Sequence, residues 1–441
     1  MMKTKLFNYW VLLIVVIISS CKGDSITPNL EVSKTIFTNV SPNGDDLTIS
    51  ITSNSSWSVI SNKSWCVLDQ NLGNNDATLK ITLQPNEEQT QRTASVTIKT
   101  ETITKTISIT QAALTLTEDQ LKTHHYRIPV IFHVLYKDQT DSKQYMRKGR
   151  AAEIITACNA LYSNRSGNST DINLEFVLAT EDPSGNMLEE SGVERILWDT
   201  PTMDCEAFMS NNVKKNINLL WNPDKYVNIM LYTFTEESIL GISHLPYTIS
   251  PDDLGGLSNL LFVPQQSNLS YPHCVSINNA YINEAQSQEG QYYNTLDVVA
   301  TLTHELGHYF GLHHAFNEKE VNGELSTDVC ENTDYCDDTP AYNRYEYETF
   351  LDNYTPISGT KLTFADLPYL MKRRDCITHL ESTPNNIMDY SISYVNRFTP
   401  EQKERIRYVL NHSPFIPGPK VTRTRTRSVD GPQEFPMQML K

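Results

Sequence analysis

The sequence predicts a multidomain protein in which an N-terminal all-β sandwich precedes a larger α/β (α+β) domain. Its 441 residues exceed the length of most single domains. Between residues 29 and 113, apolar residues alternate with polar ones, as they do in half-buried strands. Between residues 125 and 412, continuous apolar runs mix with apolar residues at helical spacing. These observations separate the two parts of the chain.

Alternation is clearest at Leu47, Ile49 and Ile51, where each apolar residue is followed by a polar one. It recurs at 79–83, 94–98 and 107–109. Turn residues such as Pro42-Asn43-Gly44-Asp45 separate these segments at short intervals. This pattern is typical of a small antiparallel sandwich.

The N-terminal segment also carries a family resemblance. Trp57, Trp65, Asn86, Arg92 and the ending Thr110-Gln111-Ala112-Ala113 resemble the BACON domain of surface proteins from gut Bacteroidetes. That resemblance implies glycan or mucin as a partner of the sandwich. Because aromatic residues at strand positions usually pack inward, we expect the two tryptophans to lie in a hydrophobic core, and the domain would then be a spacer.

Residues 114–124 form a polar linker, after which the larger domain begins. We expect strands at Ile128–Tyr136, 174–178 and Val227–Phe234, and a helix over 151–161. Residues 413–441 contain several prolines and the basic residues Lys420, Arg423, Arg425 and Arg427. We expect this Pro/Arg-rich tail to be solvated.

Residues 1–20 have the pattern of a lipoprotein signal peptide. Two lysines precede an apolar run from Trp10 to Ile18, which is too short to span a bilayer permanently. The stretch Ile18-Ser19-Ser20-Cys21 resembles a bacterial lipobox, which implies cleavage before Cys21 and acylation of that cysteine. Residues 21–28 would then be a lipidated linker, and the chain an exported lipoprotein anchored to a membrane. A plain signal peptide with an incidental cysteine is the alternative.

Charge and cysteine content limit the partners and the compartment. The chain has 36 Lys and Arg against 52 Asp and Glu, a net charge of −16. We expect no nucleic-acid partner, because phosphate binding needs a basic face. An exported chain permits disulfides. We expect one bridge among Cys330, Cys336 and Cys376, although its connectivity cannot be read from the sequence.

A metal-binding motif begins at His304. His304 and His308 follow apolar residues at helical spacing, for which Asn294 or Thr295 is the expected N-cap. Since residues four apart lie on one face of a helix, both imidazoles can bind a single zinc ion. Glu305 lies between them, in the position of the general base of this motif.

A catalytic zinc ion usually has three protein ligands and leaves one position for water. His314 provides the third ligand. The helix must end before it, and Gly311 is the residue that can adopt positive φ in the turn. His313 cannot substitute at the same spacing, so we expect it to be exposed or to lie outside the ligand set.

This pattern, HExxHxxGxxH, is the metzincin signature. The segment Asn385–Tyr390 resembles the Met-turn of that group. Together with Asp337-Asp338-Thr339-Pro340, Arg397–Gln402 and the run 128–136, it resembles the pappalysin or cytophagalysin metalloendopeptidases over about 127–411. Zinc-dependent metalloproteinase lipoproteins of Bacteroides are similar in having a lipobox and an N-terminal sandwich as well.

The resemblance implies one catalytic Zn2+ ion and roles for further residues. Met388 would lie beneath the ligands, and Tyr390 would stand beside the metal and bind the oxyanion. Ca2+ is the second metal that the resemblance implies, with Asp337 and Asp338 as ligands, although adjacent carboxylates also cap turns. Members often have a cysteine on each side of the Met-turn, whereas here Cys376 precedes it and none follows. The resemblance further implies exposure at the outer membrane or cell surface.

The sequence therefore predicts a secreted, lipid-anchored zinc metalloendopeptidase. It would hydrolyse protein or peptide substrates through a zinc-activated water, with Glu305 as the general base. The alternative is a catalytically silent surface adhesin that binds zinc and uses the sandwich to bind glycan or mucin. Retention of Glu305 with all three histidines weighs against it. Thr399, Pro400 and Gln402 predict a capping box that starts the last helix.

Overall fold

The computed structural model describes residues 27–441 apart from 166, 201, 250–253, 285–296, 323, 391 and 422–428. The chain divides into two compact units, one ending at Ala112 and the other containing Glu87–Gln91 and Ala113–Lys441. The predicted signal peptide and Cys21 lie outside the described residues. Within those residues, no helix is both long enough and apolar enough to cross a membrane.

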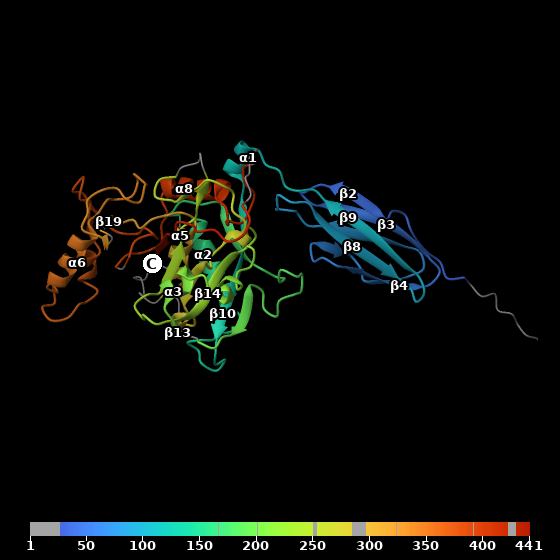
Figure 1. Ribbon diagram of the computed structural model, residues 1–441, viewed down its shortest axis with the longest axis horizontal. Coiled ribbons are helices and arrows are strands. Elements are labelled where there is room, and N and C mark those ends of the chain that lie inside the picture. Colours follow the sequence, from blue (N-terminus) through green and yellow to red (C-terminus); the bar gives the residue numbers. More distant parts are fainter. Residues whose placement is uncertain are drawn as a thin grey trace, which may run out of the picture. The chain divides into compact units, whose positions relative to one another are not determined.

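The first unit is a sandwich of two sheets (Figure 1). One sheet has the order β1 (Leu30–Val32), β3 (Asp45–Ser53), β7 (Ala77–Leu83) and β5 (Cys66–Leu68). The other has the order β2 (Ile36–Val40), β9 (Thr104–Gln111), β8 (Arg92–Lys99), β4 (Ser56–Ser61) and β6 (Leu72–Asn74). Leu47, Ile49 and Ile51 all face the core, which confirms the predicted alternation.

Trp57 belongs to the core of this sandwich. Its side chain is 2% exposed, and its Nε1 donates a hydrogen bond to the Asn75 carbonyl oxygen at 3.0 Å. Gly73 makes room for the indole, since a Cβ atom there would lie 2.1 Å from the ring. Trp65 is half-buried and lies 4.1 Å below the Arg92 guanidinium. A buried indole cannot stack on a sugar ring, so the core interpretation holds for Trp57.

The second unit is built on a sheet with the order β11 (Leu174–Leu178), β10 (Tyr126–Tyr136), β14 (Val227–Phe234), β18 (Val275–Asn278), β15 (Gly241–His244) and β23 (Met439–Leu440). β12 (Val193–Leu197) also pairs with β10, and β13 (Thr202–Met203) with β14. The first four strands are parallel, whereas β15 and β23 run antiparallel to their neighbours. The three strands expected from apolar runs are confirmed.

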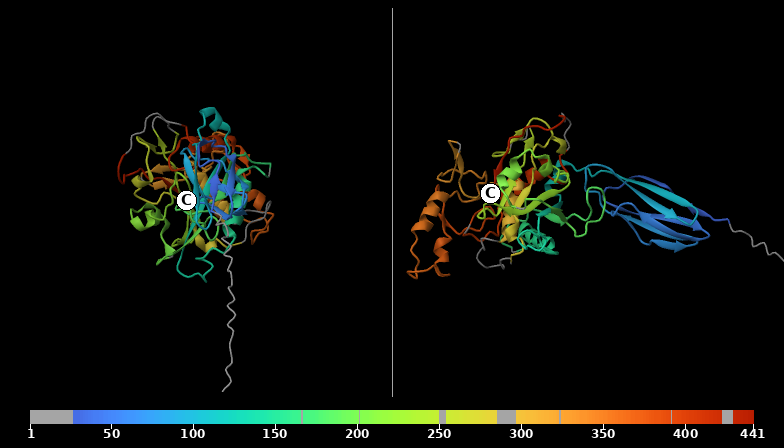
Figure 2. Two further views of the ribbon diagram at one scale, coloured as in Figure 1. Left: turned by 90° about the vertical axis from the view of Figure 1, so that its right-hand side faces the viewer. Right: turned by 60° about the horizontal axis from the view of Figure 1, so that its bottom comes forward.

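The longest described helices that pack against the core of this sheet are α2 (Arg150–Tyr162), α5 (Val298–Tyr309) and α8 (Pro400–His412). Two views in Figure 2 show them with the sheet. The shorter helices are α1 (Glu118–Thr123), α3 (Cys205–Ser210), α4 (Lys214–Ile217), α6 (Arg344–Asn353) and α7 (Leu367–Leu370). Three two-stranded sheets complete the described structure: β16 (Thr248–Ile249) with β17 (Asn259–Leu260), β19 (Lys319–Val321) with β20 (Glu324–Ser326), and β21 (Arg373–Arg374) with β22 (Glu381–Ser382).

The predicted capping box of α8 is present. The Gln402 amide donates to Thr399 Oγ1 at 3.2 Å, and the Thr399 amide donates to Gln402 Oε1 at 3.0 Å. The same Gln402 side chain exchanges two hydrogen bonds with Asn386, at 3.0 and 3.1 Å. The cap therefore fixes the start of α8 and also holds the segment that precedes Met388.

The expectation of a solvated tail is wrong for the described parts of 413–441. Phe415 and Phe435 are buried, and Met439–Leu440 forms β23 on the edge of the main sheet. The Lys420 ammonium donates to the Leu410 carbonyl oxygen at 2.6 Å. Prolines and basic residues dominate the tail's composition, but its few apolar side chains and the unpaired edge of β15 provide enough contacts to order it. Arg423, Arg425 and Arg427 lie outside the described residues.

The expected disulfide is confirmed and joins Cys330 to Cys376. Cys336, the third candidate, is free and buried. Other free and buried cysteines are Cys66, Cys158, Cys205 and Cys274.

Candidate metal centre

The helix that carries the motif starts later than predicted. Asp297 is the N-cap of α5, and its Oδ1 accepts a hydrogen bond from the Val299 amide at 2.8 Å. The prediction of Asn294 or Thr295 is therefore wrong, and both of those residues lie outside the described part of the chain. The helix starts at Asp297 because its carboxylate accepts hydrogen bonds from amides of the first turn, which have no partner within the helix.

The chain turns at Gly311, two residues after α5 ends. Gly311 has φ of +90°, and a Cβ atom there would lie 2.8 Å from the Val409 side chain of α8. The Arg405 guanidinium donates to the Gly311 carbonyl oxygen at 2.5 Å. Positive φ, the close approach of α8 and this hydrogen bond together reverse the chain and bring His314 back towards α5.

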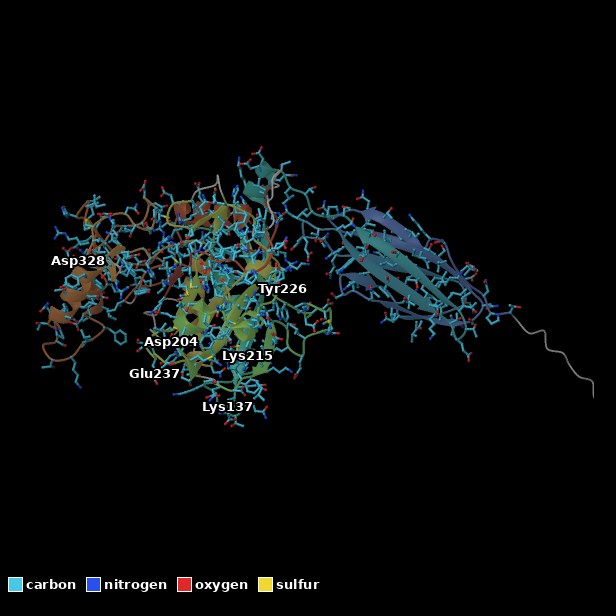
Figure 3. The ribbon with its side chains drawn as sticks, in the orientation of Figure 1. Lys137, Asp204, Lys215, Tyr226, Glu237 and Asp328 are labelled. Atoms are coloured by element: carbon cyan, nitrogen blue, oxygen red, sulfur yellow. A yellow bond between two sulfur atoms is a disulfide. The ribbon has the colours of Figure 1, made fainter. Side chains whose placement is uncertain are left out.

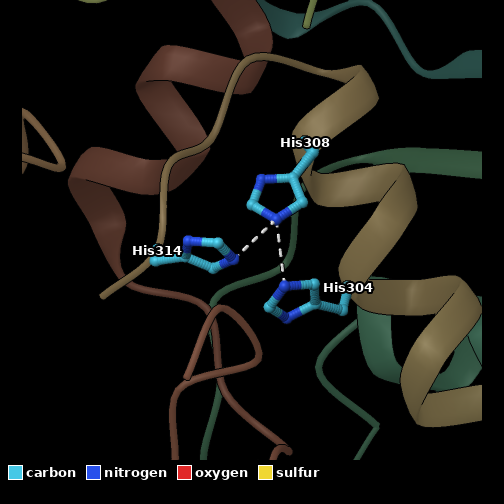
Figure 4. A group of neighbouring side chains, drawn as sticks. All are labelled: His304, His308 and His314. Atoms are coloured by element: carbon cyan, nitrogen blue, oxygen red, sulfur yellow. Dashed lines mark hydrogen bonds between the residues drawn. The ribbon is translucent and has the colours of Figure 1, made fainter. Parts of the chain in front are cut away.

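Three imidazoles meet at one point as a result (Figure 4). His308 Nε2 lies 3.0 Å from His304 Nε2 and 3.2 Å from His314 Nε2. All three side chains are buried. Within the described residues, this is the one group of three or more potential ligands that lies close enough to hold a metal ion.

The opposite ring nitrogen of each histidine is held by an oxygen acceptor. His304 Nδ1 donates to the Ile387 carbonyl oxygen, and His308 Nδ1 to the Leu312 carbonyl oxygen, both at 2.8 Å. His314 Nδ1 donates to Glu318 Oε1 at 2.8 Å. Since these oxygens only accept, they favour a proton on each Nδ1, and each neutral imidazole then presents a lone pair at Nε2. His314 Nε2 also has an acceptor nearby, the Lys441 main-chain oxygen at 3.1 Å.

These residues fit a metal ion. Three lone pairs about 3 Å apart repel one another unless a cation lies among them. Burial lowers the pKa of His304 to about 3 and the pKa of His308 well below its usual range, so both are neutral, which is the form that binds metals. The Glu318 carboxylate behind His314 is the outer-shell partner that metal-binding histidines commonly have.

Glu305 lies on the same helix with its carboxylate inside the protein. Its side chain is 2% exposed, and burial raises its pKa well above the usual range. Among the described residues, no group donates a hydrogen bond to its Oε2 atom. Gly241, the first residue of β15, makes room for it, because a Cβ atom there would lie 2.6 Å from Glu305 Cγ. A buried carboxylate with one oxygen unoccupied can accept a proton.

The Met-turn supports the metal ligands from below. Met388 is fully buried, and a Cβ atom at Gly307 would lie 2.4 Å from its sulfur. Gly307 stands between His304 and His308, so the absence of a side chain there allows Met388 to pack directly under the helix. The Ala315 amide also donates to the Met388 carbonyl oxygen at 2.9 Å, which fixes the residue next to His314.

Tyr390 stands at the edge of the same group. Its ring lies 4.7 Å from the His314 ring and 5.5 Å from the His304 ring, between centroids. The Arg344 guanidinium lies 4.4 Å from its ring centroid. Asp389 fixes the preceding position, because its carboxylate accepts from the Tyr390 amide and is paired with the buried Arg373.

His304, Glu305 and Tyr390 line a pocket of about 490 Å³. Other elements also line this pocket. They contribute Gly241 at the start of β15, Thr301 of α5 and Arg344 of α6. Lys441 also lines this pocket. A polypeptide side chain could occupy such a volume.

Three other predicted residues lie outside the cluster. His313 does not belong to the group of converging imidazoles and packs against Tyr335, with ring centroids 5.3 Å apart. Asp337 and Asp338 are exposed. Asp337 Oδ1 accepts a hydrogen bond from the Asn332 side chain at 3.0 Å. Asp338 Oδ2 accepts one from the Glu401 amide, at the start of α8, also at 3.0 Å. The two carboxylates cap a turn and a helix, and the expectation of calcium finds no support.

Sequence reasoning missed Glu318, Asp297 and Lys441. Glu318 is four residues after His314, a spacing that could have marked it as a partner of the third ligand. The carbonyl groups of Leu312 and Ile387 left no signal, because every residue has one.

Comparisons with known proteins bear on both units. Residues 209–411 match the Peptidase_M43 family model, described as "Pregnancy-associated plasma protein-A". Residues 55–112 match the BACON family model, described as "Putative binding domain, N-terminal". A comparison with curated proteins finds no match.

Similar solved structures include a Bacteroides ovatus GH5 xyloglucanase, at 14% identity over 47% of this chain with a TM-score of 0.19. The chain spans 55% of that enzyme's length. A protein from Bacteroides thetaiotaomicron, solved by NMR, is 16% identical over 21% of this chain and 95% of its own, with a TM-score of 0.17. At these TM-scores, neither structure bears on the function of this chain.

The contact between His314 and Glu318 generates a prediction about metal affinity. Glu318→Gln should weaken the binding of a divalent metal by about 10- to 100-fold, because the amide no longer supplies a negative charge behind the ligand. Competition with a chromophoric chelator measures this affinity. Glu331→Gln is the matched control, since Glu331 is exposed and paired with Lys319. Equal affinities in Glu318→Gln and the unmodified protein would contradict this role.

Proposed function

The chain carries a BACON domain followed by a Peptidase_M43 metallopeptidase domain, and we propose that it is a zinc metalloendopeptidase of the metzincin type. One observation carries the proposal. Three buried imidazoles converge through their Nε2 atoms, and one of them, His304, lines a pocket of about 490 Å³ together with the buried Glu305. Ligands, a base and space for a peptide side chain are thus present together.

His304, His308 and His314 would hold the zinc ion. Bound zinc supplies Lewis acidity, which lowers the pKa of a coordinated water from about 15.7 to about 7 and polarises a carbonyl group. The chain contributes the orientation of the ligands, through the acceptors at Ile387, Leu312 and Glu318. These acceptors keep each Nε2 free of protons.

Glu305 is the general base in this proposal. Its carboxylate takes a proton from the water that attacks the peptide carbonyl carbon. It returns the proton to the amine nitrogen as the carbon–nitrogen bond breaks, so one water is consumed and two peptides result. The raised pKa of the buried carboxyl suits this exchange, because a base that works near neutral pH must also give up its proton.

Tyr390 is proposed to stabilise the oxyanion that forms from the peptide carbonyl. Its ring lies against those of His304 and His314, so the residue belongs to the immediate surroundings of the reaction. The Arg344 guanidinium beside the ring favours negative charge at this edge of the pocket. A hydroxyl that donates only to the developing oxyanion lowers the barrier without strengthening substrate binding.

The silent-adhesin alternative is less well supported. A protein that merely bound zinc would need neither the buried carboxylate of Glu305 nor the space in front of it. Binding of glycan or mucin by the sandwich stays a proposal, and it would have to use groups other than the buried Trp57. Trp65, half-buried below Arg92, is the aromatic residue nearer the surface.

We also propose that the chain is exported and anchored through Cys21 to the outer membrane or cell surface. The support is the sequence pattern before that cysteine. Fatty-acid labelling that persists in Cys21→Ser would contradict the anchor.

The assignment of Glu305 predicts a separation of metal binding from turnover. Glu305→Gln should retain one zinc per chain and lose about 10²- to 10⁴-fold in kcat on casein or a peptide library, because the amide cannot accept the proton. Metal analysis and cleavage assays are made on the same sample. Glu404→Gln, an exposed position of α8, is the control. Full activity in Glu305→Gln would exclude Glu305 as the base.

The assignment of Tyr390 predicts an effect on kcat alone. Tyr390→Phe should reduce kcat by about 10²-fold with little change in KM, because the hydroxyl acts only as the oxyanion forms. Steady-state kinetics on a cleaved peptide separate the two constants. Tyr345→Phe, at an exposed position of α6, controls for loss of a hydroxyl in the same region. An unchanged kcat in Tyr390→Phe would remove Tyr390 from the mechanism.

A further inference from the structure

The tail forms an extended strand in the site just described. Met439–Leu440 (β23) pairs antiparallel with β15, with Leu440 opposite Ser243 and Met439 opposite His244. The Leu245 amide donates to the Gln438 carbonyl oxygen at 3.0 Å. The Gln438 side chain accepts from the amide and hydroxyl of Ser258, both at 3.0 Å. This segment therefore binds as a peptide that adds a strand to a sheet edge.

The strand that receives the segment leads directly to the metal centre. β15 pairs on its other side with β18, so β23 covers an edge that would otherwise present unpaired amides and carbonyls. β15 begins at Gly241, which packs against Glu305 and lines the pocket. A peptide bound along this edge therefore extends towards Glu305, the proposed base.

The antiparallel direction determines which residue reaches the imidazoles. Residue numbers rise along the tail as they fall along β15, so Lys441 lies at the Gly241 end. Its main-chain oxygen lies 3.1 Å from His314 Nε2, and the residue lines the pocket. In Figure 1 the C label falls beside α5 and α3, in agreement with these contacts. A peptide bound as the tail is bound would therefore bring the main-chain carbonyl group of its residue at this position beside the proposed metal ligands.

The side chain of Lys441 points to an acidic residue. Its ammonium forms an ion pair with Glu206 of α3, and Asp204 caps that helix. Hydrogen bonds from Ser238 are the main cause of the lowered pKa of Glu236, and the positive charge of Lys441 lowers it slightly further. Asp204, the N-cap of α3, is labelled in Figure 3. The surroundings of the Lys441 side chain are therefore negative.

We propose that Glu206 determines specificity by selecting a basic side chain at the residue immediately before the cleaved bond, and that residues 438–441 occupy this subsite as a substrate would. The inference rests on the proposed peptidase function, since it names the class of peptide. It also means that the tail competes with substrate for β15. Main-chain hydrogen bonds hold any extended peptide, whereas the ion pair with Glu206 distinguishes lysine or arginine from neutral residues.

The expected preference is modest. The side chains of Glu206 and Lys441 are 53% and 43% exposed, and an ion pair in such a position is weakened by solvent. We expect a basic residue to be favoured over glutamine by about three- to fivefold, and the preference to shrink as salt is added.

Peptide binding tests this without requiring turnover. A fluorescent peptide would contain the sequence of residues 435–441 followed by two alanines, and a second would replace its lysine by glutamine. Both are titrated by fluorescence anisotropy into full-length Glu305→Gln protein, with zinc and after chelation. The lysine peptide should bind about three- to fivefold more tightly, and Glu206→Gln in the same protein should abolish the difference. Glu237→Gln, which removes one negative charge from an exposed position, should preserve it.

Two further results separate the inference from the proposed function. Lys441→Glu, made in the full chain, should strengthen binding of the added lysine peptide, because the tail loses its attraction to Glu206. Equal affinities of the two peptides, or a difference that survives Glu206→Gln, would overturn the inference even if the unmodified enzyme cleaves peptides. Absence of cleavage by the unmodified enzyme would count against the peptidase function alone, and the binding difference would still show that Glu206 recognises the basic residue.

Discussion

The metal centre depends on three hydrogen bonds that are remote from the metal position. Each imidazole donates its Nδ1 proton to a fixed oxygen, of Ile387, Leu312 or Glu318, and this leaves three Nε2 lone pairs directed at one point. Two of these acceptors are main-chain carbonyls in the Met-turn and in the turn after Gly311. The loops around α5 therefore determine the protonation of the ligands as well as their positions.

The same loops connect the centre to the rest of the domain. Gln402, which caps α8, also holds Asn386 before the Met-turn, and Arg405 of α8 donates to the Gly311 carbonyl. Gly307 and Gly241 allow Met388 and Glu305 to approach where a Cβ atom would collide with them. One C-terminal helix thus fixes both turns that carry acceptors for the ligands, and two glycines of different elements provide the space.

Elements with a regular pattern could be predicted from the sequence, as could residues with fixed spacing. The alternation in β3, the apolar runs of β10 and β14, and the capping box at Thr399 all have local physical causes. Asp297 replaced the expected N-cap because several polar residues precede α5 and only the folded chain selects one. The strand formed by the tail could not be predicted from residues 413–441 alone. It depends on the edge of β15, which exists only once the sheet has assembled.

The proposed function requires three histidine nitrogens to bind one metal ion. X-ray absorption at the zinc edge tests this most directly, using full-length protein loaded with one equivalent of zinc. We expect three imidazole nitrogens at about 2.0–2.1 Å from the zinc ion, with oxygen in the remaining position. A sulfur ligand near 2.3 Å, or fewer than three imidazoles, would contradict it.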